Sequence, residues 1–95
     1  MRLDSLEISA LKHALEDVHG NAYLFGSRVD DSRKGGDIDL LIFSKDSPYK
    51  ISQNISLKFF KMCEEKIDVL VMDKDKLTEE QRAFLGTIKM ERLKL

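Results

Sequence analysis

Three aspartates stand at the starts of two apolar runs, where a carboxylate is unusual. Asp37 and Asp39 open the run that ends at Phe43, and Asp68 opens a second run. Carboxylates are costly to remove from water, and they repel one another when they lie close together. Mg²⁺ would relieve that repulsion, because it takes oxygen ligands and commonly shares them with substrate phosphates. The aspartates therefore predict phosphoryl-type transfer, in which two ions activate the attacking oxygen and stabilise the leaving one.

A Gly-Ser pair ahead of these acids supplies groups that suit a phosphate. Gly26 lets the backbone approach a phosphate closely, and Ser27 offers a hydroxyl and an amide N–H for its oxygens. The polar segment that follows adds three basic candidates, Arg28, Arg33 and Lys34. Arg28 is the strongest of them because it follows Ser27 directly, although a solvated loop cation is an equal alternative.

Hydrophobic periodicity predicts three helices and three strands that must position these residues. Their order along the chain is helix, strand, polar loop, strand, helix, strand and helix. Capping boxes of Asp4 with Glu7 and of Thr78 with Gln81 mark the starts of the first and last helices. The helices are expected at Asp4 to His19, at about Lys50 to Cys63 and from Thr78 onward, and the strands at Ala22 to Phe25, Ile38 to Phe43 and Ile67 to Met72.

The connections between the strands predict their directions. A helix joins the second and third strands, so they should run parallel through a right-handed crossover, and the first strand should be antiparallel to the second. The economical solution is an α/β (α+β) fold with a small three-stranded mixed sheet packed with helices. Parallel neighbours start at one end of a sheet about 5 Å apart, so Asp68 is expected beside Asp39. The first strand should bring Gly26 and Ser27 to the same end of the sheet.

An Asp-x-Asp pair alone is weak evidence for a metal site, since most such pairs are solvated turn acids or helix caps. The combination of a Gly-Ser strand end, Asp37 with Asp39, and the strand-borne Asp68 is more specific. Elsewhere, the adjacent Phe59 and Phe60 fit helix packing, and one of the two rings should face outward, where it can contact a partner.

The stretch FGSRVDDSRKGGDIDLLI, residues 25–42, resembles the signature of the minimal nucleotidyltransferases, small members of the DNA polymerase β-like superfamily. The resemblance implies the nucleotidyltransferase fold, ATP as substrate and two Mg²⁺ ions, for which Mn²⁺ can substitute. It implies that Gly26 and Ser27 bind the nucleoside triphosphate, that Asp37 and Asp39 are paired metal ligands, and that Asp68 is the third carboxylate, which serves the catalytic metal and helps activate the acceptor hydroxyl.

Two features depart from the family pattern. The segment between Ser27 and Asp37 holds nine residues, one fewer than the family usually has. Asp31 stands where many members have glycine. We therefore expect a tighter loop that is more acidic near the phosphates, while every expected metal ligand is retained.

The resemblance implies transfer of AMP from ATP to a hydroxyl of a protein acceptor. The similar antitoxins of this family imply a helical HEPN toxin as that acceptor, and the pair would form a toxin–antitoxin system. A different class of function remains open, namely a binding module that neutralises a partner toxin by occlusion. A fragment of a larger polymerase or drug-modifying transferase is a weaker third hypothesis.

Length and composition limit the number of domains, the kinds of partner and the cellular compartment that we expect. Ninety-five residues predict a single domain over residues 1–95, and the net charge of −1 makes a long nucleic acid an unexpected partner. The single cysteine excludes an internal disulfide and favours a reducing compartment. We find no stretch long enough to span a membrane and no signal-peptide core, so a cytoplasmic protein is expected, as a monomer or in a homo- or hetero-oligomer.

Overall fold

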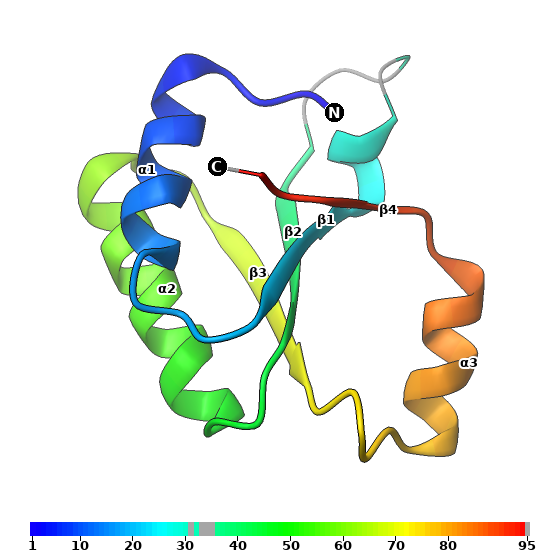
Figure 1. The fold of residues 1–95 in the computed structure, drawn as a ribbon. Coiled ribbons are helices and arrows are strands. Elements are labelled where there is room, and N and C mark those ends of the chain that lie inside the picture. Colours follow the sequence, from blue (N-terminus) through cyan, green and yellow to red (C-terminus); the bar gives the residue numbers. More distant parts are fainter. Residues whose placement is uncertain (31, 33–35, 95) are drawn as a thin grey trace.

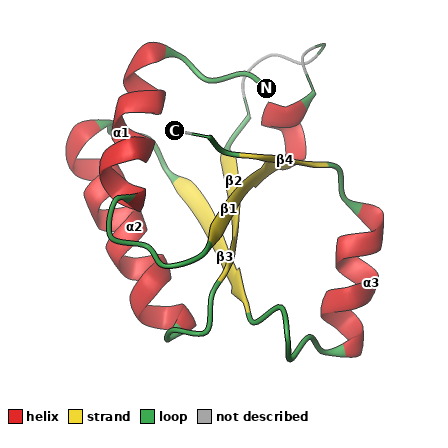
Figure 2. Cartoon of the chain, in the orientation of Figure 1, coloured by secondary structure: helices red, strands yellow, loops and turns green. Residues whose placement is uncertain are grey.

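The computed structural model describes residues 1–30, 32 and 36–94, and the expected roles of Asp31, Arg33 and Lys34 lie outside the described residues. A mixed four-stranded sheet in the order β3-β2-β1-β4 forms the centre of the molecule (Figure 1). Helices α1 and α2 lie together on one side of this sheet, and α3 lies on the other (Figure 2). The elements are α1 (Ser5–Leu15), β1 (Asn21–Phe25), β2 (Ile38–Phe43), α2 (Pro48–Met62), β3 (Ile67–Met72), α3 (Glu79–Thr87) and β4 (Met90–Arg92).

The strand directions expected from the sequence are confirmed. Strand β2 pairs antiparallel with β1 and parallel with β3. Asp39 stands opposite Phe25 of β1 on one side and beside Asp68 of β3 on the other. The central strand therefore brings the last residue of β1 and the first residues of β3 to the same end of the sheet.

The expectation of three strands was wrong, because a fourth strand, β4, pairs antiparallel with β1. It has only three residues, and its two outer residues, Met90 and Arg92, are exposed. So short a segment shows no alternation of apolar and polar residues that would predict a strand. Leu93 directly after it is buried in the core, and its N–H donates to the Ala22 carbonyl at 2.9 Å.

The first helix is shorter than predicted and ends at Leu15 instead of His19. The N–H groups of Glu16 and Val18 donate to carbonyls three residues back, so the chain tightens into turns and leaves the α-helix. His19 consequently lies outside the helix. The capping box of Asp4 and Glu7 is confirmed, with both of its hydrogen bonds formed.

Helix α2 begins at Pro48, two residues before the expected Lys50, because the fixed φ and missing N–H of proline suit the first helical turn. The capping box at Thr78 and Gln81 starts α3 as expected. Among the described residues, no helix combines the length and the apolar character needed to cross a membrane.

The main hydrophobic cluster fills the space between the sheet and the pair α1–α2. On the opposite face α3 contributes no buried residue, although Leu41 of β2 is completely buried there. The contact of α3 with the sheet includes an edge-to-face pair of Phe84 and Phe25, whose ring centroids are 5.7 Å apart. The largest fully buried side chains in the described part of the protein are Phe59, Leu11, Leu24, Ile38, Leu40, Leu41, Ile42 and Ile55.

Adjacent phenylalanines on α2 test this packing, because Phe59 is completely buried and Phe60 is 55% exposed. Phe59→Ala should lower the free energy of unfolding by about 3–5 kcal/mol, the usual result of a large cavity. Phe60→Ala, the matched control, should change it by less than about 1 kcal/mol. Urea unfolding monitored by circular dichroism measures the stability of both variants. Equal losses of stability would mean that α2 packs through a different face.

Candidate active site

The site is built around Asp39 on the central strand. Asp39 and Asp68 are register partners on adjacent parallel strands, which lie about 5 Å apart, and partners share one face of the sheet. This pairing was expected from the sequence and is confirmed. Asp37 precedes the first residue of β2 and is exposed. The three aspartates thus lie at the same end of the sheet, where β2 and β3 begin.

The ionisation of Asp39 responds to its burial and to the charges of the other two aspartates. Burial raises the pKa of the Asp39 carboxyl, and the negative charges of Asp68 and Asp37 raise it further. Among the described residues, no three His, Cys, Asp or Glu side chains are grouped so that they could hold one metal ion as they stand. The carboxylates therefore interact through their charges without forming a finished metal cage.

Two glycines let other parts of the site approach closely. Gly26 follows β1, begins a short 3₁₀ helix (Gly26–Val29) and has φ +74°, which disfavours any residue with a Cβ. A methyl group there would collide with Oδ2 of Asp39. Gly36 has φ +90°, and a methyl group there would collide with the Ser27 hydroxyl. Gly36 was not predicted as a site residue, although its place directly before Asp37 was a usable signal.

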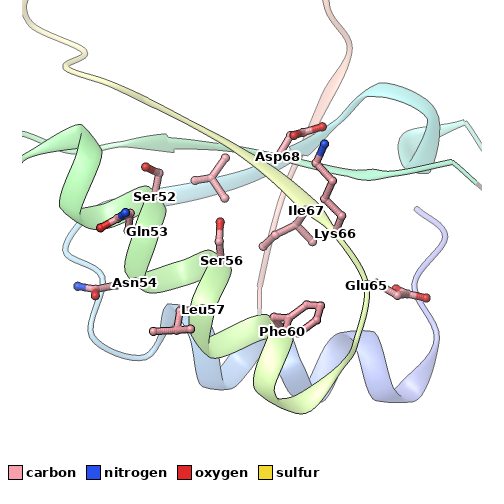
Figure 3. A pocket seen from close by; sticks show the side chains of 11 residues that line it. Ser52, Gln53, Asn54, Ser56, Leu57, Phe60, Glu65, Lys66, Ile67 and Asp68 are labelled. Atoms are coloured by element: carbon pink, nitrogen blue, oxygen red, sulfur yellow. The ribbon is translucent and has the colours of Figure 1, made fainter.

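An open groove of about 770 Å³ runs between α2 and β3 and borders the site (Figure 3). Its lining includes Asp68 at one end, together with Leu57 and Phe60 of α2. Both of these apolar side chains are more than half exposed. The outward-facing phenylalanine expected from the sequence is therefore Phe60.

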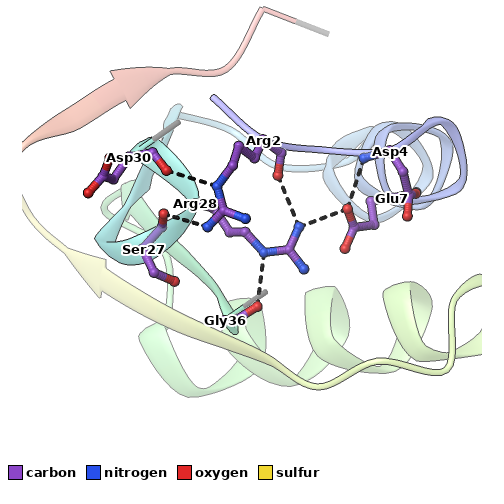
Figure 4. Close-up of polar contacts among 7 residues, drawn as sticks. All are labelled: Arg2, Asp4, Glu7, Ser27, Arg28, Asp30 and Gly36. Atoms are coloured by element: carbon purple, nitrogen blue, oxygen red, sulfur yellow. Dashed lines mark hydrogen bonds and ion pairs between the residues drawn. The ribbon is translucent and has the colours of Figure 1, made fainter. Parts of the chain in front are cut away.

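Arg28 fastens the turn after Ser27 to other parts of the chain (Figure 4). Its Nη1 donates to Glu7 Oε1 at 2.9 Å and to the Arg2 carbonyl at 3.0 Å. Its Nε donates to the Gly36 carbonyl at 2.9 Å. These contacts tie both ends of the polar loop to the N-terminus of α1. Nucleotide binding by Arg28 stays a prediction, and the structure gives its guanidinium a role in holding the loop.

Arg2 reinforces the same turn from the N-terminal segment. Its Nη2 donates to the Ser27 carbonyl, and its Nε donates to the Asp30 carbonyl, both at 2.8 Å. Its backbone N–H donates to the Arg28 carbonyl, also at 2.8 Å. Sequence reasoning missed Arg2 and Glu7 as supports of the site, because their partners lie more than twenty residues away along the chain.

Glu7 is the buried partner of this cluster, with only 3% of its side chain exposed. Burial opposes ionisation of Glu7, but hydrogen bonds with Arg28, Glu65 and the Asp4 backbone outweigh it and lower the pKa of Glu7. The pKa of Glu65 is raised, first by its hydrogen bond with Glu7 and then by burial. Glu7 is thus the ionised partner of Arg28. Of the two carboxyl groups of Glu7 and Glu65, that of Glu65 holds a proton more readily.

Comparison with known families identifies the class of the protein. A family model described as polymerase beta, nucleotidyltransferase matches residues 9–91, which include β1, the following turn, β2 and β3. The chain belongs to this family, and it is a transferase of the nucleotidyltransferase type. A search of curated proteins finds no match.

The raised pKa of Asp39 predicts how stability depends on pH. The folded protein holds the Asp39 proton more tightly than the unfolded chain, whose carboxyl titrates near 3.8, so ionised Asp39 destabilises the fold. At pH 7 in EDTA, Asp39→Asn should therefore melt at a higher temperature than the wild type. The difference should shrink as the pH falls through the raised pKa and vanish below 3.8. Thermal melting from pH 7 to acid measures it. A lower melting temperature of the variant at pH 7 would mean that the carboxylate supports the fold.

The Glu7–Arg28 pair predicts a specific loss of stability. Glu7→Gln removes the charge while keeping the size, and it should lower the free energy of unfolding by about 2–3 kcal/mol, as expected for a hydrogen bond to a charged group. Glu16→Gln is the matched control, because Glu16 lies directly after α1 and is 56% exposed. The control should be nearly neutral. Urea unfolding of both variants would refute a structural pair if the two losses were equal.

Proposed function

We propose that the chain transfers AMP from ATP to a hydroxyl group of a protein acceptor. The observation that carries the proposal is the cluster of the Gly26-Ser27 turn, which directly follows β1, with the register partners Asp39 and Asp68. This cluster brings groups that suit a phosphate together with carboxylates that suit a metal ion. Membership of the nucleotidyltransferase family supports the reaction class.

The carboxylates fit a divalent metal. Mg²⁺ is commonly held by one or two carboxylates together with waters and substrate phosphates, so a complete protein cage is unnecessary. Asp39 and Asp68 would hold it, with Asp37 contributing to a second ion. Bound Mg²⁺, or Mn²⁺ in its place, would offset the charge of the carboxylates and of the triphosphate. Burial raises the pKa of Asp39, and repulsion from Asp68 and Asp37 raises it further, which supports a site that is completed by a cation.

The turn after β1 would bind the triphosphate. The Ser27 hydroxyl and the N–H groups of the turn are donors for phosphate oxygens, and the missing side chain of Gly26 lets the Asp39 carboxylate lie close to this turn. Arg2 and Arg28 hold this turn through six hydrogen bonds at 2.8 to 3.0 Å, so its donors are already oriented. Preorganised donors of this kind reduce the ordering that binding requires.

The transfer itself is a displacement at the α-phosphorus. The acceptor oxygen forms a bond to that phosphorus, and the bond to the bridging oxygen of pyrophosphate breaks, so pyrophosphate leaves. The hydroxyl proton passes to the Asp68 carboxylate, which is exposed at the rim of the groove and can release it to water. Asp39, between Gly26 and Asp68, would position the phosphate relative to the acceptor.

The acceptor is proposed to be a helical HEPN toxin, by resemblance to the minimal nucleotidyltransferase antitoxins. Attachment of AMP to one of its hydroxyls would inactivate it. A net charge of −1 agrees better with a protein acceptor than with a long nucleic acid. Exposed apolar side chains, among them Leu57 and Phe60, offer a surface for a protein partner. The same surface is consistent with neutralisation by occlusion, so the test must separate the two functions.

Metal dependence gives the test of the site. ATP titrated into the protein by calorimetry should bind with Mg²⁺ or Mn²⁺ and at least about tenfold more weakly in EDTA, because the carboxylates then repel the triphosphate. A cognate toxin incubated with the protein, ATP and Mg²⁺ should gain the mass of one AMP. Asp39→Asn should reduce this transfer by at least about 100-fold.

Three outcomes contradict the proposal in different ways. Equal ATP affinity with and without metal would remove the metal site. A toxin silenced without any mass change, and equally well by Asp39→Asn, would make the protein a binding module. Transfer of AMP to an RNA end and not to the toxin would keep the enzyme but replace the acceptor.

A further inference from the structure

The groove between α2 and β3 is shaped by small side chains on the helix. Ser52 and Ser56 lie one helical turn apart and face the strand, with Phe60 a turn further on (Figure 3). The short serine side chains leave the strand uncovered along this line. Ile67 and Val69 of β3 form the opposite wall. The groove therefore combines an apolar floor with a rim of hydroxyl groups.

The outer edge of β3 carries unpaired backbone groups. Strand β3 is the last strand of the sheet, and in the described part of the chain no strand pairs with its outer side. The Ser44 N–H donates to the Met72 carbonyl at 3.0 Å, so the backbone groups of Met72 point toward β2. Because these directions alternate along a strand, the N–H and C=O groups of Ile67, Val69 and Val71 point outward. Such an edge is a template for an added strand.

A strand added at this edge would carry its side chains alternately to the two faces of the sheet. It would lie about 5 Å from β3, and the residue beside Asp68 would share the face of Asp68 and Asp39. The residues on either side of it would face the groove, where Leu57 and Phe60 are exposed. One strand can thus present a hydroxyl to the carboxylates and apolar side chains to the groove.

The charges at the end of the groove also favour a peptide over a triphosphate. Glu65 and Asp68 supply two carboxylates there against the single ammonium group of Lys66. A phosphate chain with no metal ion between it and these carboxylates would be repelled, whereas a neutral or basic peptide would be tolerated.

We propose that an extended segment of the acceptor protein adds to the outer edge of β3 as a further strand, with its hydroxyl residue beside Asp68 and its apolar neighbours in the α2–β3 groove. This inference rests on the proposed transfer to a protein hydroxyl. It assigns the recognition of the acceptor to main-chain hydrogen bonds and to Leu57 and Phe60, so it requires an unfolded or extended stretch around the modified residue.

Val69 gives a sharp test, because its N–H points outward and takes no part in the pairing with β2. Val69→Pro removes that donor, and proline is tolerated on an edge strand whose N–H faces solvent. Val69→Ala keeps the N–H and is the matched control for lost side-chain packing. The probe is a library of ten-residue peptides with a central Tyr, Ser or Thr, incubated with radiolabelled ATP and Mg²⁺.

The labelled peptides should carry apolar residues next to the central hydroxyl residue. For the best of them, Val69→Pro should lower kcat/KM at least about tenfold, and Val69→Ala should lower it by less than about threefold. Calorimetry should find ATP binding unchanged in both variants. That peptide should also protect the Val69 and Val71 amides of the wild type from hydrogen exchange, a result that decides the question if Val69→Pro does not fold.

Other occupants of the edge would overturn the inference. Unchanged peptide transfer by folded Val69→Pro, or absence of amide protection, would exclude strand addition. Protection of Val69 by ATP and Mg²⁺ alone would assign the groove to the nucleotide, and protection that grows with protein concentration would assign it to a second copy of this chain. AMP transfer to a folded toxin but to no peptide would refute the inference while leaving the proposed function intact, whereas no transfer to either would refute both.

Discussion

The opposite pairing of β2 with its two neighbours is the constraint on which the site depends. Antiparallel pairing with β1 and parallel pairing with β3 bring the end of one strand and the starts of two others together. Since side chains alternate between faces, the burial of Leu40 and Ile42 against α1 and α2 forces Asp39 to the other face. A slip of one residue would place the carboxylate in the core. The apolar core therefore fixes the face of the sheet to which Asp39 points.

The polar loop that follows β1 needs a different kind of support, because it has few apolar residues to bury. Its described ends are held by Arg2 and Arg28, which donate mainly to backbone carbonyls, and Arg28 is anchored to the buried Glu7 of α1. A guanidinium suits this task because it presents several donors in a rigid plane. The N-terminal segment thus becomes part of the site's support, although Gly26, Asp39 and Asp68 all lie elsewhere in the chain. Loss of that segment would release the turn while leaving the sheet paired.

The sequence predicted what depends on local pattern and strand connection. The strands β2 and β3, the two capping boxes and the pairing of Asp39 with Asp68 follow from periodicity and from the helix that joins parallel strands. It could not predict β4, because three residues carry no periodic signal and only the edge of β1 makes them a strand. The Glu7–Arg28 pair was equally hidden. Its partners are 21 positions apart, and Glu7 was already explained as part of a capping box. Gly36 is an intermediate case. The glycine next to Asp37 can be read from the sequence, but its close approach to Ser27 depends on how the loop folds.

The unequal cover of the two faces explains why a small domain can keep a face and an edge accessible. Helices α1 and α2 bury the apolar face of the sheet, whereas α3 has no buried residue of its own and leaves Leu70 40% exposed on the face that carries the aspartates. A second helix packed over that face would stabilise the fold, but it would also cover Asp39 and Asp68. The uncovered edge of β3 adds to this accessibility, because in the described part of the chain no strand occupies the outer side of the strand that carries Asp68. Accessibility of the carboxylates and incomplete burial are therefore two consequences of a single arrangement, and a partner that docks at this edge would complete both the site and the packing.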